Sequence, residues 1–220
     1  MSRNGKIVDR VTRPSREFQI VCPHFAGLTA EEADLVGCLP IGDANGATLA
    51  AAGSLGDDGI FAGILAADPF RPAPMLIGML RAAGVRAVIN LPTVAAITDG
   101  IAQALSHAGA DYAAELATLT LAAAEGLEVM TVVATPAQAR LAIEAGLRQL
   151  LVYPTAIDGA ASPASTPAAL ALDTLETIRT AAPDAIVLAF RHPAYEASLE
   201  PLIARSDAVV EWAVGAGEWV

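Results

Sequence analysis

Short apolar runs recur along the chain at nearly regular intervals and predict buried strands. Each run is continuous rather than alternating with polar residues, which is typical of a parallel sheet whose outer face is covered by helices. The eight runs span residues 18–22, 34–39, 59–65, 85–90, 127–133, 147–152, 185–190 and 208–212.

Amphipathic, alanine-rich stretches of helical period separate these runs. Thr135-Pro136 and Thr166-Pro167 each place a capping residue before a proline at the first helical position, which is a common helix start. The stretch from residue 72 to 83 is followed by Gly84, a favourable residue after a helix C-terminus. Strand and helix alternating in this way predict a single compact (β/α)8 TIM barrel, with an open doubly wound sheet as the alternative.

Charge divides the chain into two unequal parts. There are 13 Lys and Arg residues against 24 Asp and Glu, giving a net charge of −11, yet five of the basic residues and only one acidic residue lie within residues 1–16. We therefore predict a short, flexible basic tail over residues 1–16 and one TIM-barrel domain over residues 17–220. The barrel keeps 8 basic against 23 acidic side chains, so it repels phosphate backbones and no nucleic-acid partner is expected.

The composition also excludes a disordered chain, because 54% of the residues are hydrophobic and only 17% are charged. No membrane span is expected, since Gly, Pro or a charge interrupts the apolar stretches well before the roughly 20 residues that a bilayer requires. Residues 1–16 contain no apolar signal-peptide core. These observations predict a cytoplasmic protein.

Lysine and cysteine usage excludes several chemistries. Lys6 is the only lysine and falls in the predicted tail, which argues against a Schiff-base enzyme, a pyridoxal phosphate enzyme and a phosphate-loop lysine. We expect no pyridoxal phosphate, NAD or haem. Cys22 and Cys38 are too few for a zinc cluster or a disulfide framework and are predicted to be buried thiols.

Polar residues that follow the apolar runs are the candidates for chemistry, because a TIM barrel carries its active site at the C-terminal ends of its strands. The residues predicted to act in catalysis are Asp68, His24, His192 and Asp43. The residues predicted to bind a small anionic substrate are Asn90, Thr93, Arg71, Asn45, Tyr153, Arg191 and Glu211. Asp68 and Asp43 could also hold Mg²⁺ or another divalent ion through hard oxygen ligands, whereas no histidine pair has the spacing of a zinc site. Two alternatives stay open: Asp43 as a helix cap, and His24 and His192 as loop residues beside prolines.

Three of these segments together resemble a known TIM-barrel family, described as phosphoenolpyruvate-hydrolase-like or indole-glycerol-phosphate-synthase-like. They are LPIGDAN at residues 39–45, GIFAGILAADPFR at residues 59–71 and GVRAVINLPTVAAITDG at residues 84–100. Their order and spacing agree with the family over roughly residues 18–215. The resemblance implies a TIM barrel and, through the family's name, an enzyme acting on a phosphorylated oxo-acid.

The later segments depart from the family's pattern. A histidine-containing His-Met-Gly-Leu-Thr segment of the family is Tyr153-Pro154-Thr155 here, and its His-Gly-Gly-Pro is Arg191-His192-Pro193. Two hypotheses follow. The first is a lysine-independent lyase or hydrolase for a small carboxylate or phosphorylated oxo-acid, in which His24 or His192 moves the proton. The second is a degenerate barrel that binds a ligand or a protein without catalysis.

A helix-like stretch at residues 113–124 predicts self-association. It is apolar or small on nearly every side, whereas the outer helix of a monomeric barrel should show a charged stripe. Small side chains allow close helix packing across a two-fold axis. We therefore expect a homo-oligomer that buries the helix containing Leu116 and Leu119, and an alanine-rich composition without such meaning is the alternative.

Overall fold

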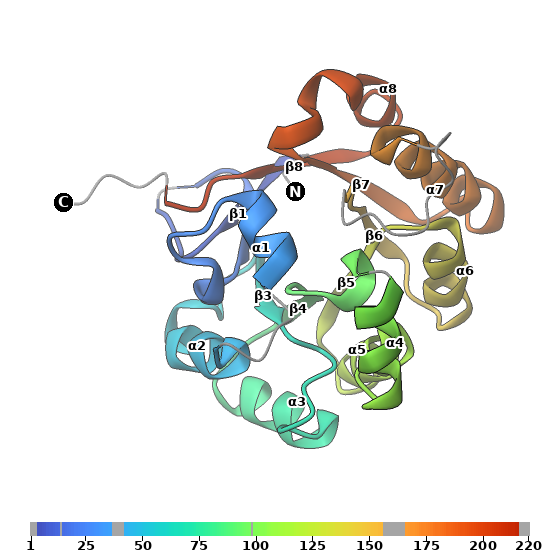
Figure 1. Ribbon diagram of the computed structural model, residues 1–220. Coiled ribbons are helices and arrows are strands. Elements are labelled where there is room, and N and C mark those ends of the chain that lie inside the picture. Colours follow the sequence, from blue (N-terminus) through green and yellow to red (C-terminus); the bar gives the residue numbers. More distant parts are fainter. Residues whose placement is uncertain (1–3, 14, 37–41, 98, 156–165, 216–220) are drawn as a thin grey trace.

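The chain folds into a closed barrel of eight parallel strands with helices around it (Figure 1). The computed structural model describes residues 4–13, 15–36, 42–97, 99–155 and 166–215. The strands pair in chain order from β1 to β8, and β8 pairs with β1, which closes the sheet. The predicted (β/α)8 barrel is confirmed.

The elements follow one another as the apolar runs predict for most of the chain. The strands are β1 (Asn4–Val8), β2 (Phe18–Val21), β3 (Ile60–Ile64), β4 (Ala87–Asn90), β5 (Glu128–Val133), β6 (Gln149–Val152), β7 (Ile186–Arg191) and β8 (Ala208–Trp212). The α-helices are α1 (Ala30–Val36), α2 (Ala44–Ala51), α3 (Ala73–Ala82), α4 (Asp99–His107), α5 (Tyr112–Ala124), α6 (Pro136–Glu144), α7 (Pro167–Ala181) and α8 (Glu200–Ile203). Short 3₁₀ helices are η1 (Pro23–Phe25), η2 (Ala52–Ser54), η3 (Val94–Ala96) and η4 (Pro193–Ser198).

The prediction of a flexible tail over residues 1–16 is wrong, because β1 lies within it. Asn4–Val8 pairs with β2 on one side and with β8 on the other, so the barrel domain begins before residue 17. Lys6 points outward and forms an ion pair with Glu17 at 2.8 Å, its side chain being 40% exposed. A strand with a charged outer face has no continuous apolar run, which is why the pattern does not reveal it.

The strand predicted at residues 34–39 is also wrong. Residues 34–36 belong to helix α1, and residues 37–39, with Cys38, lie outside the described part of the chain. Helix α1 begins after Thr29, whose hydroxyl accepts from the Glu32 N–H at 3.2 Å while the Glu32 carboxylate accepts from the Thr29 N–H at 2.8 Å. This reciprocal pair is a capping box, and it makes the following residues helical in spite of their apolar content.

Alternate strand residues face the lumen, where large side chains fill the C-terminal half of the barrel. Tyr153, directly after β6, stacks on Phe190 of β7 with ring centroids 4.6 Å apart, and Trp212 of β8 lies 6.5 Å from Phe190. The predicted thiol Cys22 is buried here, and burial raises its pKa. Among the described residues, these side chains pack around the C-terminal end of the barrel axis.

Two of the outer helices begin at the predicted capping residues, and two leucines of α5 pack inside the monomer. The caps at Thr135 and Thr166 are confirmed, each side chain accepting a backbone N–H of its helix. Leu116 and Leu119 of α5 are buried within the monomer, so an interface between two copies would have to use the other side of this helix. The homo-oligomer itself stays a prediction.

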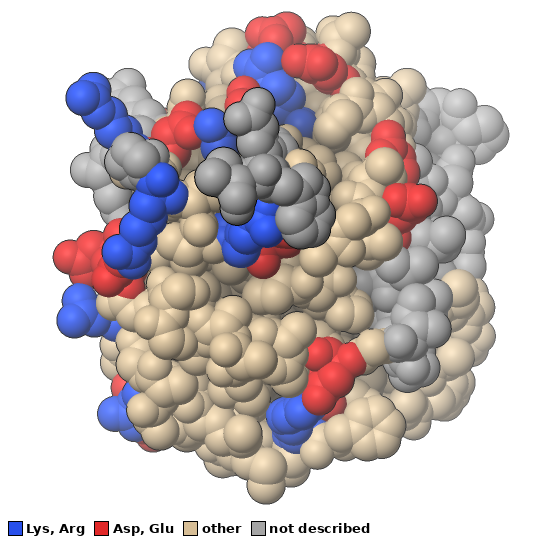
Figure 2. Space-filling view, turned by 90° about the vertical axis from the view of Figure 1, so that its left-hand side faces the viewer, with Lys and Arg blue, Asp and Glu red and all other residues tan. Residues whose placement is uncertain are grey.

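Charge is unevenly spread over the outer surface. Residues 44–54, which form α2 and η2, contain no charged side chain, and the face that carries α2 is largely uncharged in the lower half of Figure 2. Within the described residues, no helix combines the length and the apolar character that crossing a lipid bilayer requires.

Two glycines give a testable contrast in packing. A Cβ on Gly63 would overlap the Cys22 sulfur and lie 2.5 Å from the Leu91 carbonyl oxygen, whereas a Cβ on Gly78 in α3 would meet nothing within 4 Å. We expect Gly63→Ala to lower the free energy of unfolding by about 2–3 kcal/mol through overpacking. Gly78→Ala should raise it by roughly 0.5–1 kcal/mol, because a helix gains from alanine. Urea unfolding of both variants tests the contrast, and equal effects would contradict it.

Candidate functional site

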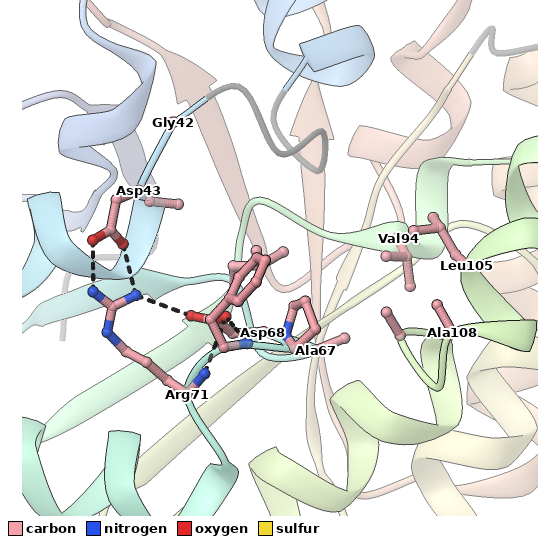
Figure 3. Close-up of a pocket in the computed structure, with 13 residues that line it drawn as sticks. Gly42, Asp43, Ala67, Asp68, Arg71, Val94, Leu105 and Ala108 are labelled. Atoms are coloured by element: carbon pink, nitrogen blue, oxygen red, sulfur yellow. Dashed lines mark hydrogen bonds and ion pairs between the residues drawn. The ribbon is translucent and has the colours of Figure 1, made fainter.

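A pocket of about 690 Å³ lies beside the barrel axis, at the C-terminal end of β3 and between α2 and α4. One side of it is charged, with Asp43, Asp68 and Arg71, and Figure 3 shows Val94, Leu105 and Ala108 on the other side. Asp43 therefore meets Asp68 and Arg71, and Arg71 is 28 residues further along the chain than Asp43. Its size is within the range of about 300–1,000 Å³ that small-molecule sites occupy.

Arg71 is the centre of the charged side. Its Nη1 and Nη2 donate to the two carboxylate oxygens of Asp43 at 2.7 and 2.5 Å, and Nη1 also donates to Asp68 Oδ2 at 3.2 Å (Figure 3). The hydrogen bonds from Arg71 and then from the Gly46 N–H hold the pKa of Asp43 below its usual value. Asp43 thus serves both as an ion-pair partner and as the N-cap of α2, so the predicted capping role is confirmed.

The two carboxylates differ in how firmly they are held. The Asp68 side chain is 5% exposed, and its Oδ1 accepts from the N–H groups of Phe70 and Arg71 at 2.8 and 3.2 Å. Asn45 Nδ2 donates to Asp68 Oδ2 at 2.9 Å, and Asn45 also exchanges two hydrogen bonds with the backbone of Leu65 at the end of β3. The Asp43 side chain is 56% exposed. Asp68 is therefore a fixed support for Arg71, and Asp43 is a partner that solvent can reach.

His24 lies next to this cluster. Gly42 lines the pocket, and a Cβ placed on it would come within 2.8 Å of His24 Cε1, so the imidazole packs directly against this backbone. Partial burial lowers the pKa of His24, and the nearby Asp43 carboxylate opposes that shift. A lowered pKa leaves the imidazole neutral at pH 7 and able to accept a proton.

The residues do not fit the expected divalent ion. The Arg71 guanidinium lies between Asp43 and Asp68 and donates to both, so a cation already occupies the position that a metal would need. Among the residues that the structure describes, no three His, Cys, Asp or Glu side chains converge in a way that could hold a metal. We assign no step to a metal ion.

Asn90 and Thr93 are predicted to bind substrate, but both side chains donate hydrogen bonds to the buried carboxylate of Glu115. Asn90 Nδ2 and Thr93 Oγ1 each donate to Glu115 Oε2 at 2.7 Å, and the Val94 N–H donates to Glu115 Oε1 at 2.8 Å. Asn90 Oδ1 accepts from the Val132 N–H at 2.8 Å. Because these polar atoms are buried and paired, Asn90 and Thr93 hold the loop after β4 against α5 and do not contribute to the pocket.

His192 and Tyr153 meet at the mouth of the barrel on a residue that the sequence analysis did not select, Asp34. Tyr153 Oη donates to Asp34 Oδ1 at 2.6 Å, and His192 Nε2 lies 3.1 Å from Asp34 Oδ2. The Ala194 N–H donates to His192 Nδ1 at 3.1 Å, which assigns the proton of a neutral ring to Nε2. Both ring nitrogens of this buried imidazole are thus engaged, and His192 positions α1 rather than lining the pocket. The capping box at Thr29 and Glu32 is the sequence signal that would have placed Asp34 on a helix.

Arg191 and Glu211, also predicted to bind substrate, lie on the outer face of the barrel. They are register partners on β7 and β8, and Arg191 Nε lies 3.9 Å from Glu211 Oε1. Arg191 also approaches Glu196 and Glu200, at 3.5 and 3.9 Å. Arg191 therefore faces three carboxylates, and neither Arg191 nor Glu211 lines the pocket.

Two solved structures resemble the chain at low sequence identity. One, described as "Native KDPGal structure", is 17% identical with a TM-score of 0.46, covering 94% of this chain and 81% of that chain. The other, described as "Crystal structure of a putative phosphonomutase from Burkholderia cenocepacia J2315", is 14% identical with a TM-score of 0.48, covering 94% of this chain and 85% of that chain.

Sequence comparison gives a closer relationship. The uncharacterized protein y4oT of Sinorhizobium fredii (strain NBRC 101917 / NGR234) is 33% identical over 150 residues, which are 66% of this chain and 76% of that protein. The model of a family described as phosphoenolpyruvate hydrolase-like matches residues 28–196, which include the pocket, Asp34 and His192. The chain belongs to the phosphoenolpyruvate hydrolase-like family.

Proposed function

We propose that this protein is a lyase- or hydrolase-type enzyme that binds a small carboxylate or phosphorylated oxo-acid through Arg71. Membership of the phosphoenolpyruvate hydrolase-like family supports an enzyme of this type. The observation that carries the proposal is the two-pronged contact of Arg71 with Asp43, which is the geometry in which arginine binds a substrate carboxylate or phosphate. Asp43 occupies the anion position in the structure, and the substrate replaces it.

The difference in exposure between the two carboxylates supports this exchange. Asp43 is more than half exposed, so water can replace Arg71 at its carboxylate at a cost of about 1 kcal/mol while the Gly46 N–H keeps its hydrogen bond to Oδ1. Asp68 stays in place because two backbone N–H groups and Asn45 hold it. Arg71 is thereby kept in the same position before and after the exchange.

His24 is the residue that we propose to move a proton. It is the neutral imidazole beside Asp43, whereas His192 is buried with both nitrogens engaged. Lysine chemistry is not needed, since Lys6 lies on the outer face of β1, paired with Glu17.

The proposal is tested by incubating the purified protein with a panel of small carboxylates and phosphorylated oxo-acids. NMR of the mixtures follows loss of substrate and release of phosphate, and calorimetry follows binding. Turnover of a panel member that also competes with pyruvate for the pocket is the expected result. Binding without turnover would support the non-catalytic barrel instead, and the absence of both would overturn the use of Arg71 as an anion site.

Anion affinity should depend on pH through His24. As the pH falls through the pKa of His24, which lies below its usual 6.5, the imidazolium that forms attracts the released Asp43 carboxylate and favours the exchange. We expect the Kd of pyruvate, which stays ionised, to fall roughly two- to fivefold between pH 8 and pH 5. His24→Gln should remove this dependence, and calorimetry on both proteins measures it. An unchanged pH profile in the variant would contradict the role of His24.

A further inference from the structure

The pocket is divided into a charged side and an apolar side, and a three-carbon acid uses only the first. Asp43, Asp68 and Arg71 belong to the loops after β2 and β3. Across from them, Val94 and Leu105 with Ala108 form a wall without any charged side chain (Figure 3). An anion bound to Arg71 would leave this wall in contact with water.

Phe70 extends the apolar lining next to the anion position. It directly precedes Arg71 in the chain, lines the pocket, and is 79% exposed, the largest value among the exposed large apolar side chains of the described residues. Its N–H is fixed to Asp68 Oδ1 at 2.8 Å, so the backbone that carries the ring is held beside the guanidinium. A ligand that reaches from Arg71 toward Leu105 would cover the ring and remove this apolar surface from water.

The volume supports a ligand larger than a three-carbon acid. A pocket of about 690 Å³ holds roughly the liquid volume of 20 water molecules at about 30 Å³ each, and a three-carbon acid occupies only a small share of it. Binding sites of this size bury most of their ligand and are lined mainly by apolar side chains with a few placed polar groups.

We propose that the substrate of this pocket is an oxo-acid, or its phosphorylated form, that carries an apolar group, with the anion on Arg71 and the apolar group between Phe70 and the wall formed by Val94, Leu105 and Ala108. The inference rests on the proposed function of the same site. It adds the substrate class, which is an anion with an aliphatic or aromatic tail.

The test measures affinity against the length of the apolar group. Calorimetry with pyruvate, 2-oxobutyrate, 2-oxohexanoate and phenylpyruvate keeps the anion constant while the tail grows. We expect the Kd to fall by about fourfold for each methylene group that becomes buried. Equal Kd values along the series would overturn this inference while leaving the anion site intact. Failure of every oxo-acid to bind, pyruvate included, would overturn the proposed function itself.

A pair of matched variants locates the tail. Ala108 lies directly after α4 and lines the pocket. Ala104 lies within α4, is also exposed, and does not line the pocket. Ala108→Asn should weaken phenylpyruvate by about fivefold by placing an amide on the apolar wall, with pyruvate unchanged. Ala104→Asn should change neither. Loss of phenylpyruvate affinity in both variants, or in neither, would contradict the placement of the tail.

Discussion

Arg71→Gln is expected to weaken the binding of pyruvate and phenylpyruvate by about 100-fold, because the substitution removes two charge-assisted hydrogen bonds to the anion. The supporting carboxylate of Asp68 would also be left without its cationic partner in a buried position. The affinity of Arg71→Lys for these anions should lie between that of the parent protein and that of Arg71→Gln, since an ammonium group keeps the charge but cannot make the two-pronged contact. Calorimetry measures the Kd, and kcat/KM should fall by a similar factor for any substrate that the panel identifies.

Two further variants separate anion binding from a structural role of Arg71. Arg81→Gln, on the surface of α3 where Arg81 pairs with Glu125, should leave the affinity unchanged. Asp43→Asn keeps the N-cap of α2, because asparagine caps as well as aspartate, but removes the competing charge. It should therefore tighten anion binding several-fold. If Asp43→Asn weakened binding as Arg71→Gln does, Asp43 would be part of the site rather than the group that the substrate displaces.

Glu115→Ala is expected to lower the free energy of unfolding by about 3–5 kcal/mol, since it removes a buried acceptor of three hydrogen bonds. The donors are Asn90 Nδ2, Thr93 Oγ1 and the Val94 N–H, and the Glu115 side chain is fully buried among them. Urea unfolding measures the change. Glu144→Ala, on the exposed side of α6, should stay within about 0.5 kcal/mol of the parent protein.

The same residue gives the stability a pH dependence of known sign. Burial raises the pKa of Glu115 from 4.5 to about 7, although the three donors offset part of the shift. The folded protein therefore keeps a proton on this carboxyl over a range in which the unfolded chain releases it. The contribution of Glu115 to stability is largest below pH 4.5 and falls as the pH rises through about 7. The difference in stability between the parent protein and Glu115→Gln should show this slope, and a flat difference would contradict it.

Seven of the eight strands could be located from apolar runs alone, because helices cover their outer faces and packing fills the lumen. The runs at residues 59–65 and 127–133, for example, contain β3 and β5. Asp68 and Arg71 could also be selected, since they follow β3 and the C-terminal strand ends meet at one side of a barrel. The selection of Asp43 depends on the strand wrongly predicted at residues 34–39, and this residue lies instead between α1 and α2.

The remaining features depend on contacts that a single sequence does not reveal. The search for apolar runs does not find β1, because Lys6 is partly exposed on the outer face of that strand and interrupts the run. Asn90 has the position of a substrate ligand, but its amide donates a hydrogen bond to Glu115, which is 25 residues further along the chain. Asp34 meets His192 across 158 residues. In each case a tertiary partner decides the role of a residue that is otherwise correctly identified as polar and well placed.

The pairing of β1 with β8 determines which part of the barrel forms last during synthesis. Every other ladder joins neighbouring strands, whereas this one must wait until residues 208–212 have left the ribosome. Until then β1 and the newest strand both present unpaired edges, which tend to aggregate with other chains. Lys6 and Glu211 are register partners at this junction. A charge on each free edge discourages pairing with foreign strands, and because the two charges have opposite signs, they attract once the nascent chain can close upon itself.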